Sequence, residues 1–417
     1  MTVRDAVGLN TPTTLDRPPE ISAVPRPYPW GESLGVALKP RSNAINSIRV
    51  ALAVLVIAGH ADALAGYGTD HNLNLLGRGM AVDCFFILSG YLMAQSWRRR
   101  PDAARYIWHR VARLVPAYWF VLVATAFFIA PIMWALTHGS LNGFGSGTDG
   151  PLSYVLDNAL MWTRQNGISG SPTGVPVSGV WNGAVWTLGW VFVCDLLLVL
   201  LGLMGFLGGR RSPIVALWLT AWAVNVAVAV APNLVGPLHN ENLAAPLRFG
   251  LVFLTGVVLH EFKERVPMRW PAAVVSLALV AGTEILMDGN YRLVAIVPLA
   301  YLLVWCSARL PFRFGSRNDL SYGVFLFGFP IQQTLVMLGV PAAGWLIFVA
   351  ASVLVAVPLA ALCWFGIEKP MMRLREVRLP IRRYTGDDGP TSRFRGLTLT
   401  TVLLVTYIAS SHLPMIG

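Results

Sequence analysis

The sequence predicts an all-α membrane protein, a polytopic bundle of about 10 core transmembrane helices plus one additional C-terminal helix. Hydrophobic residues make up 55% of the 417-residue chain and charged residues 13%, about half of the charged share of a soluble domain. The mean hydropathy is +0.58, and the apolar residues form long blocks. These three observations exclude a soluble enzyme, a disordered tail protein and a nucleic-acid-binding protein.

Eleven segments are candidate spans, because a transmembrane helix needs roughly 20 mostly apolar residues. The sixth segment is short, and the last follows a polar stretch of chain. No internal repeat is visible among them. In chain order they are residues 44–64, 79–97, 114–135, 185–208, 212–232, 246–260, 271–287, 293–309, 320–338, 342–366 and 395–413.

Four regions make up the predicted domain organisation. Residues 1–43 are expected to form a disordered cytoplasmic tail, because residues 1–40 contain seven prolines and no apolar run. No cleavable signal peptide is recognisable there, so the first span is expected to serve as the targeting signal. Residues 44–370 form the transmembrane domain, 371–394 a basic cytoplasmic linker, and 395–417 an additional transmembrane helix.

The basic residues indicate the orientation of the spans, because cytoplasmic loops carry an excess of Lys and Arg. With the N-terminus in the cytoplasm, 27 of the 32 basic residues fall in the tail and in cytoplasmic segments. Arg49 lies within a span, and the outer loops receive only four: Arg78, Arg164, Arg248 and Arg292. The formal net charge of +11 therefore reflects membrane topology, and no nucleic-acid partner is predicted.

The sequence says less about the role of the longest outer loop and of the cysteines. Residues 136–180 are rich in Gly, Ser, Thr and Asn, and this loop either covers a site on the outer face or is a flexible surface loop. The cysteines lie inside apolar runs, with no metal-ligand spacing and no disulfide pattern, so no metal site is predicted. They are Cys84, Cys194, Cys306 and Cys363.

The first span contains two ionisable residues, Arg49 and His60, separated by ten apolar ones. Charged residues inside a span are costly and are therefore functional candidates. Eleven helical steps of about 100° bring the two side chains to one face of the helix, about 16 Å apart along its axis. The alternative is that Arg49 extends to the lipid headgroups and that His60 simply lies near a helix end.

The second span places Asp83 one turn below its outer end, close to the depth of His60. A carboxylate beside an imidazole can fix its tautomer and stabilise the imidazolium. Asp83 could instead cap the helix or pair with Arg78. Ser89 and Gly90, in the middle of this span, leave little side chain and favour close packing of helices.

A strongly basic segment, residues 98–113, follows the second span. Membrane topology alone explains Arg98–Arg100. Arg110 and Arg113 are three residues apart on one helix face, where two guanidinium groups can bind phosphate. Topology remains the alternative for this pair as well.

Three blocks of sequence, in this order, resemble the acyltransferase-3 family of integral-membrane acyltransferases. They read INSIRVALAVLVIAGH at residues 45–60, VDCFFILSGYLM at 82–93 and RYIWHRVARLVPAYW at 105–119. Later blocks that also match are VWTLGW at 185–190, LSYGVFLFGFP at 320–330 and FGIEKP at 365–370. The resemblance covers about residues 44–370.

The family modifies bacterial cell-envelope sugars, so the resemblance implies an O-acyltransferase of the cytoplasmic (inner) membrane. It implies acyl-CoA, acetyl-CoA in particular, as a donor substrate from the cytoplasm, with no permanently bound cofactor. The acceptor would be a hydroxyl of a carbohydrate or glycolipid on the outer side of the lipid bilayer. The family's essential residues match His60, Arg49, Arg110 and Arg113, the three arginines as acyl-CoA-binding groups; supporting motif residues are Phe86, Ser89, Gly90, Trp186 and Glu368.

The expected chemistry is general-base catalysis by His60 with Asp83 as the orienting carboxylate. An acyl-histidine intermediate is the other route. The sequence departs from the family at Val191, where a Glu is common, and at Gly328, where a His is frequent; Asp195 offers a nearby carboxylate. A secondary transporter or flippase, with the buried charges as a substrate or proton path, and an inactive partner protein are the remaining alternatives.

Overall fold

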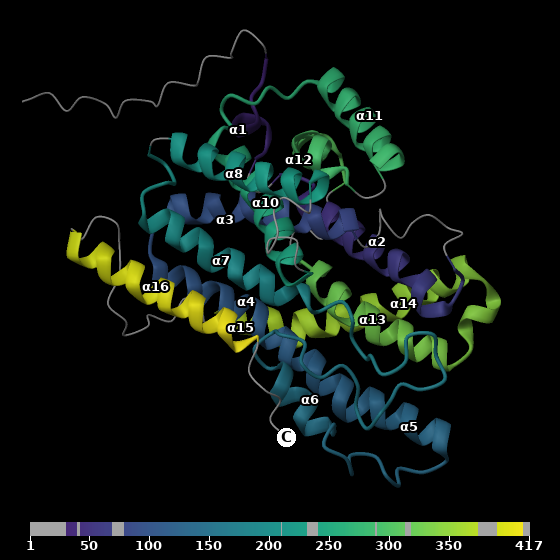
Figure 1. Ribbon diagram of the computed structural model, residues 1–417. Coiled ribbons are helices and arrows are strands. Elements are labelled where there is room, and N and C mark those ends of the chain that lie inside the picture. Colours follow the sequence, from purple (N-terminus) through teal and green to yellow (C-terminus); the bar gives the residue numbers. More distant parts are fainter. Residues whose placement is uncertain are drawn as a thin grey trace, which may run out of the picture.

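The computed structural model describes eight stretches of the chain, and all of them are helical apart from connecting segments and two isolated β-bridges. The stretches are residues 31–39, 42–68, 79–209, 211–231, 241–287, 290–312, 318–373 and 390–411. The helices of eight or more residues are α2 (Ile45–Ala65), α3 (Ala81–Arg99), α4 (Ala103–Ala124), α5 (Ala130–His138), α6 (Pro151–Asn158), α7 (Thr187–Leu203), α8 (Ser212–Val230), α10 (Glu241–Glu261), α11 (Trp270–Met287), α12 (Arg292–Arg309), α13 (Ser321–Met337), α14 (Trp345–Cys363) and α16 (Pro390–Ser410) (Figure 1).

Seven helices among the described residues are long and apolar enough to cross a membrane. They are Ile45–Ala65, Ala103–His138, Ser212–Val230, Ala244–Glu261, Trp270–Met287, Arg292–Arg309 and Trp345–Arg373, and two shorter apolar helices are Thr187–Leu203 and Gly396–Ser410. The chain is thus an all-helical, multi-pass membrane protein. A helix occupies each of the eleven predicted segments, but the count of about ten core spans stays a prediction.

Four predicted spans fall outside the seven. α7 and α16 are the two shorter apolar helices, and the surroundings of α3 and α13 explain why these two also fall outside. α3 contains Asp83, Arg98 and Arg99, and α13 has only 17 residues. Most of the α13 side chains are buried against other helices, α2 and α14 above all. A helix surrounded by protein can be shorter and more polar than one that faces lipid, because its polar groups find partners inside the bundle.

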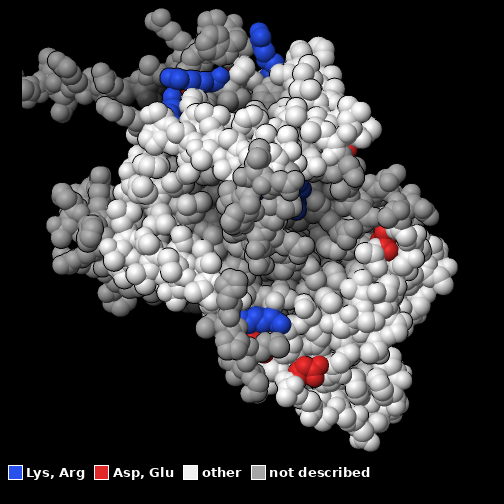
Figure 2. Space-filling view, in the orientation of Figure 1, with Lys and Arg blue, Asp and Glu red and all other residues white. Residues whose placement is uncertain are grey.

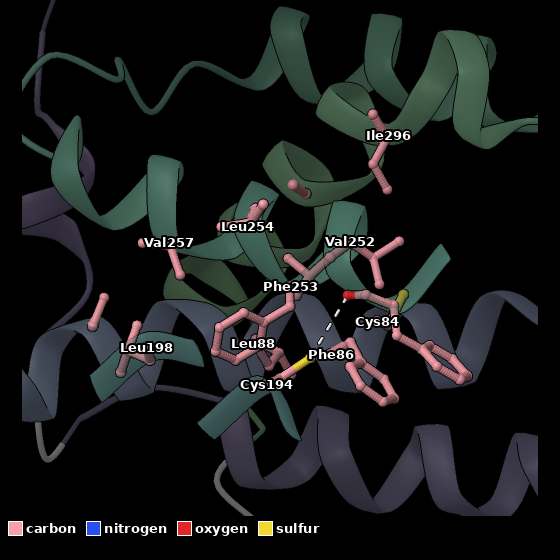
Figure 3. Close-up of a cluster of buried hydrophobic side chains, with 14 of the residues drawn as sticks. Cys84, Phe86, Leu88, Cys194, Leu198, Val252, Phe253, Leu254, Val257 and Ile296 are labelled. Carbon is pink, nitrogen blue, oxygen red and sulfur yellow. Dashed lines mark hydrogen bonds between the residues drawn. The ribbon is translucent and has the colours of Figure 1, made fainter. Parts of the chain in front are cut away.

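The main core lies where α3, α7, α10 and α12 pack together. Figure 3 shows Phe86 and Leu88 of α3, Cys194 of α7 and Phe253 of α10 in this cluster, and all four are almost fully buried. A second cluster joins α4, α7 and α13. Because these helices are separated in the sequence, their packing brings the polar ends of distant helices together.

The contact of α3 with α10 depends on two glycines. A Cβ at Gly90 would lie 2.1 Å from the carbonyl oxygen of Phe253, and one at Gly256 would lie 2.0 Å from that of Ile87. Neither position has room for a methyl group, so the two backbones touch directly. Small residues permit such close approach in membrane helices.

The outer surface of the bundle is apolar. Exposed Leu, Ile and Val side chains follow α11, α14 and α16, and the face in Figure 2 shows few charged side chains among the described residues. Helix α16 packs along α7 (Figure 1), and Tyr407 near its end donates a hydrogen bond to the carbonyl of Leu160. In water this surface would be an aggregation liability, whereas in a bilayer it faces hydrocarbon.

Two segments contain helices that the sequence analysis did not anticipate. Residues 31–39, expected to be disordered, include α1 (Leu34–Ala37), because Leu34 is fully buried and its backbone binds Val266. The outer loop 136–180 contains α6, and the buried Asn158 and Gln165 hydrogen-bond its backbone in place of water. Residues 1–30 and most of the linker 371–394 lie outside the described residues.

Candidate active site

His60 lies in the last two turns of α2 and lines a cavity of about 640 Å³. The imidazole packs edge-on against Phe329 of α13, with 5.3 Å between the ring centroids. Trp186, immediately before α7, also lines the cavity. We call this end of the bundle the His60 end and the opposite end of α2, with Arg49, the arginine end. The histidine is therefore presented to a space large enough for a small molecule.

Asp83 is fully buried behind the cavity and binds three side chains. Its carboxylate oxygens accept hydrogen bonds from Nε of Arg248 at 2.8 Å, Nε of Arg292 at 2.5 Å and the hydroxyl of Tyr291. Both arginines, unlike Asp83, line the cavity. The contacts of Asp83 described here are with Arg248 of α10 and Arg292 of α12. Its predicted role in orienting His60 therefore stays a prediction.

Arg49 and Arg113 share one carboxylate at the arginine end. Oδ2 of Asp319 lies 2.7 Å from Nη1 of Arg49 and 2.8 Å from Nη2 of Arg113, and Arg113 also binds the buried Glu368. Asp319 precedes α13, so the cluster joins α2, α4 and α13. Burial alone would raise the pKa of Asp319, but the charges of Arg49 and Arg113 outweigh it and lower that pKa to about 2.

Arg110 binds a different partner from Arg113. Its Nε donates to Oδ2 of Asp195 at 2.7 Å, and the hydroxyl of Tyr106 donates to the other oxygen at 3.1 Å. Asp195, the carboxylate near the altered Val191 position, is thus part of the arginine end. The three arginines predicted to bind phosphate are accompanied by three acids, so within the described residues their local charge is nearly balanced.

A second cavity of about 320 Å³ at the arginine end has a stronger positive charge. It lies between the end of α3 and the start of α4 and is lined by Arg99, Arg100, Arg105, His109 and two polar residues, Gln95 and Ser96. None of the described residues that line it is acidic. Asp102 instead caps α4 by accepting a hydrogen bond from the backbone of Arg105 at 3.1 Å.

The supporting motif residues take mainly packing positions. Phe86 stacks on Phe249 with ring centroids 4.2 Å apart, Ser89 is half-buried, and Gly90 touches the backbone of α10. A Cβ at Gly328 would lie 2.8 Å from Cγ1 of Ile57, so α13 leaves no room there for the His that the family often has.

Sequence reasoning missed Asp319, Tyr291, Arg248 and Arg292. The charge count assigned Arg248 to an outer loop, but it lies in α10, where its guanidinium reaches Asp83. A cation at the start of a predicted span, at the same depth as an acid in another span, is a signal that could have found this cluster. Asp319 lies at the start of the span that begins with the LSYG block, and this acid could have been matched in the same way with Arg49 of the first span.

Comparison with known proteins identifies the family of the chain. A family model described as an acyltransferase domain matches residues 42–365. The chain therefore belongs to the acyltransferase-3 family, whose members are acyltransferases. The candidate site and supporting motif residues of the sequence analysis all lie within the matched range except Glu368, which lies three residues beyond its end.

Two curated proteins are similar over most of their length. Nodulation protein 10 of Rhizobium leguminosarum bv. viciae is 27% identical over 365 residues, covering 80% of this chain and 94% of that protein. The O-acetyl transferase of Shigella phage Sf6 is 23% identical over 313 residues, covering 71% and 86%. No solved structure matches the chain.

Proposed function

We propose that this acyltransferase moves an acyl group, acetyl in the first place, from cytoplasmic acyl-CoA to a hydroxyl of an extracytoplasmic sugar or glycolipid. The observation that carries the proposal is the division of α2 between two polar environments. Arg49 lies in a cluster of arginines and acids at one end, and His60 lines a cavity at the other. A donor with phosphates and a long thioester arm can use both.

The arginine end is the proposed donor side. The Lys and Arg distribution supports a cytoplasmic location for it, and CoA is a cytoplasmic anion with several phosphate groups. Arg49, Arg110 and Arg113 already bind acids, whereas Arg99, Arg100 and Arg105 line a cavity without acidic side chains. We propose that the second cavity contributes to phosphate binding together with the three motif arginines.

The His60 end is the proposed acceptor side. A ring nitrogen of neutral His60 takes the proton of the acceptor hydroxyl while its oxygen attacks the thioester carbonyl. The carbon–sulfur bond breaks, an ester forms, and the imidazolium returns the proton to the CoA thiolate. About 16 Å along α2 separates Arg49 from His60, a span suited to the extended pantetheine arm.

Label transfer with purified full-length protein tests the proposal. Radiolabelled acetyl-CoA is incubated with the protein and with soluble or lipid-linked oligosaccharides, and ester-linked label in the oligosaccharide is measured. His60→Ala should lose more than nine-tenths of the transfer. His138→Ala is the matched control, because His138 stacks on Trp134 at the end of α5 and does not line the cavity.

Two results would refute this scheme. Transfer by His60→Ala at a tenth or more of the wild-type rate would exclude the general-base role. Transfer from another activated acyl group, with none from acyl-CoA, would exclude the donor. Label that stays on the protein after acetyl-CoA is removed, and that moves to acceptor added later, would indicate the acyl-histidine route in place of direct attack.

A further inference from the structure

The wall of the His60 cavity contains two arginines that share one buried carboxylate. Asp83 has no exposed side-chain surface, whereas the side chains of Arg248 and Arg292 are 25% and 20% exposed. Each arginine reaches Asp83 through Nε. The carboxylate thus holds the two guanidinium groups side by side, and both side chains line the cavity.

The terminal nitrogens of the two arginines converge on Gly79. Nη2 of Arg248 donates to the carbonyl of Gly79 at 2.7 Å. A Cβ placed on Gly79 would lie 3.6 Å from Nη2 of Arg292 and 3.9 Å from Nη2 of Arg248. Gly79 itself lines the cavity. Two guanidinium edges beside a residue without a side chain form a concave surface rich in N–H donors.

Among the described residues, the exposed charge at this surface comes from the two arginines. Of the cavity-lining residues that the structure describes, the acidic one is Glu284 of α11, and both of its carboxylate oxygens are buried. The carboxylate oxygens of Glu284 and the side chain of Asp83 are buried, whereas the side chains of Arg248 and Arg292 are partly exposed. Arginine edges bind carboxylate and phosphate groups through paired, charge-assisted hydrogen bonds.

We propose that Arg248 and Arg292 bind an anionic group of the acceptor, a carboxylate or a phosphate, beside the hydroxyl that His60 activates. This inference rests on the proposed function, since it assigns the acceptor to the His60 end. It adds that the acceptor is a sugar acid or a sugar phosphate, and that a neutral sugar of the same shape binds more weakly. A cavity of about 640 Å³ accommodates such a group together with a sugar ring.

Binding measurements test the inference without requiring acyl transfer. Methyl glucoside, methyl glucuronide and glucose 6-phosphate are titrated separately into the purified full-length protein and followed by ligand-observed NMR. We expect the glucuronide or the phosphate to bind at least about tenfold more tightly than the neutral glucoside. Whichever of the two anions binds more tightly identifies the anionic group as carboxylate or phosphate.

Variants locate the binding. Arg248→Gln should reduce the preference for the anion to about one, and Arg248→Lys, which keeps the charge, should restore part of it. Arg309→Gln is the matched control, because it removes an arginine that pairs with Glu32 and does not line the cavity. Unfolding temperatures of all variants show whether the cluster remains folded.

Equal binding of the charged and neutral sugars, or an unchanged preference in folded Arg248→Gln, would overturn the inference and leave acyl transfer from acyl-CoA intact. Adenosine 3′,5′-bisphosphate, the nucleotide part of CoA, is the second probe. Loss of its binding in Arg248→Gln would place the donor at the His60 end, which would contradict the proposed function as well.

Discussion

Asp319 is the residue on which the arginine end depends, because two arginines from different helices bind one of its oxygens. Removing a carboxylate from a largely buried ion-pair network leaves its partners uncompensated. We expect Asp319→Asn to lower the free energy of unfolding by about 3 kcal/mol or more. Glu32→Gln is the control, because its ion pair with Arg309 is exposed and contributes at most about 1 kcal/mol.

The stability of the wild-type protein at low pH should also depend on Asp319. The folded-state pKa of Asp319, about 2, lies below the unfolded value of about 3.9. Its contribution to stability is therefore complete above about pH 4 and is lost as the pH falls towards 2. In Asp319→Asn this part of the pH dependence should be missing; an unchanged acid transition, measured by circular dichroism in detergent, would contradict the assignment.

At the scale of elements, the contact between α3 and α10 is predicted to be intolerant of a single methyl group. Gly90→Ala places its Cβ against the carbonyl of Phe253, so the helices must separate and the protein should unfold at a lower temperature. Gly250→Ala, also in α10, meets nothing within 4 Å and should be neutral or stabilising. The unfolding temperatures of the two variants test this prediction. An equal decrease in both would refute the close-contact explanation.

CoA-binding measurements distinguish Arg105, which lines the second cavity, from Arg110 and Arg113, which pair with acids. Arg105→Ala should weaken CoA binding by about 1.5 kcal/mol without changing stability, because Arg105 is exposed and lines a cavity without acids. Arg110→Ala and Arg113→Ala should weaken it by about 1.5–3 kcal/mol each and also lower stability, since Asp195 and Glu368 lose their partner. Unchanged CoA dissociation constants in all three variants would return these arginines to a purely topological role.

The elements could be predicted from the sequence much better than their contacts. Apolar runs of about 20 residues mark the spans directly, since the bilayer fixes their length. The spacing of Arg49 and His60 places them on one face of a single helix, and the structure has both on α2. The partners of Arg49, Arg110 and Asp83 come from helices far along the chain, and no local pattern encodes which helices pack together.

At the scale of the whole molecule, the predicted topology can be read by thiol labelling. The native cysteines are first replaced, and single cysteines are introduced at Ser140 and Ser178 in the outer loop and at Pro101 beside α4, all exposed positions. Ala103 is unsuitable because only 4% of it is exposed. A membrane-impermeant reagent added to whole cells should label positions 140 and 178 and spare position 101; the reverse pattern would invert the orientation.

The central claim is that acyl groups pass from a cytoplasmic donor to an acceptor on the other face, and sealed membrane vesicles test it most directly. Radiolabelled acetyl-CoA is added outside to inverted and to right-side-out vesicles. In the proposed topology, inverted vesicles expose the arginine end and right-side-out vesicles expose the His60 end. We predict ester-linked label in envelope glycans enclosed by the inverted vesicles, little in right-side-out vesicles, and none with His60→Ala. Label in right-side-out vesicles alone, or equal label with His60→Ala, would contradict the account.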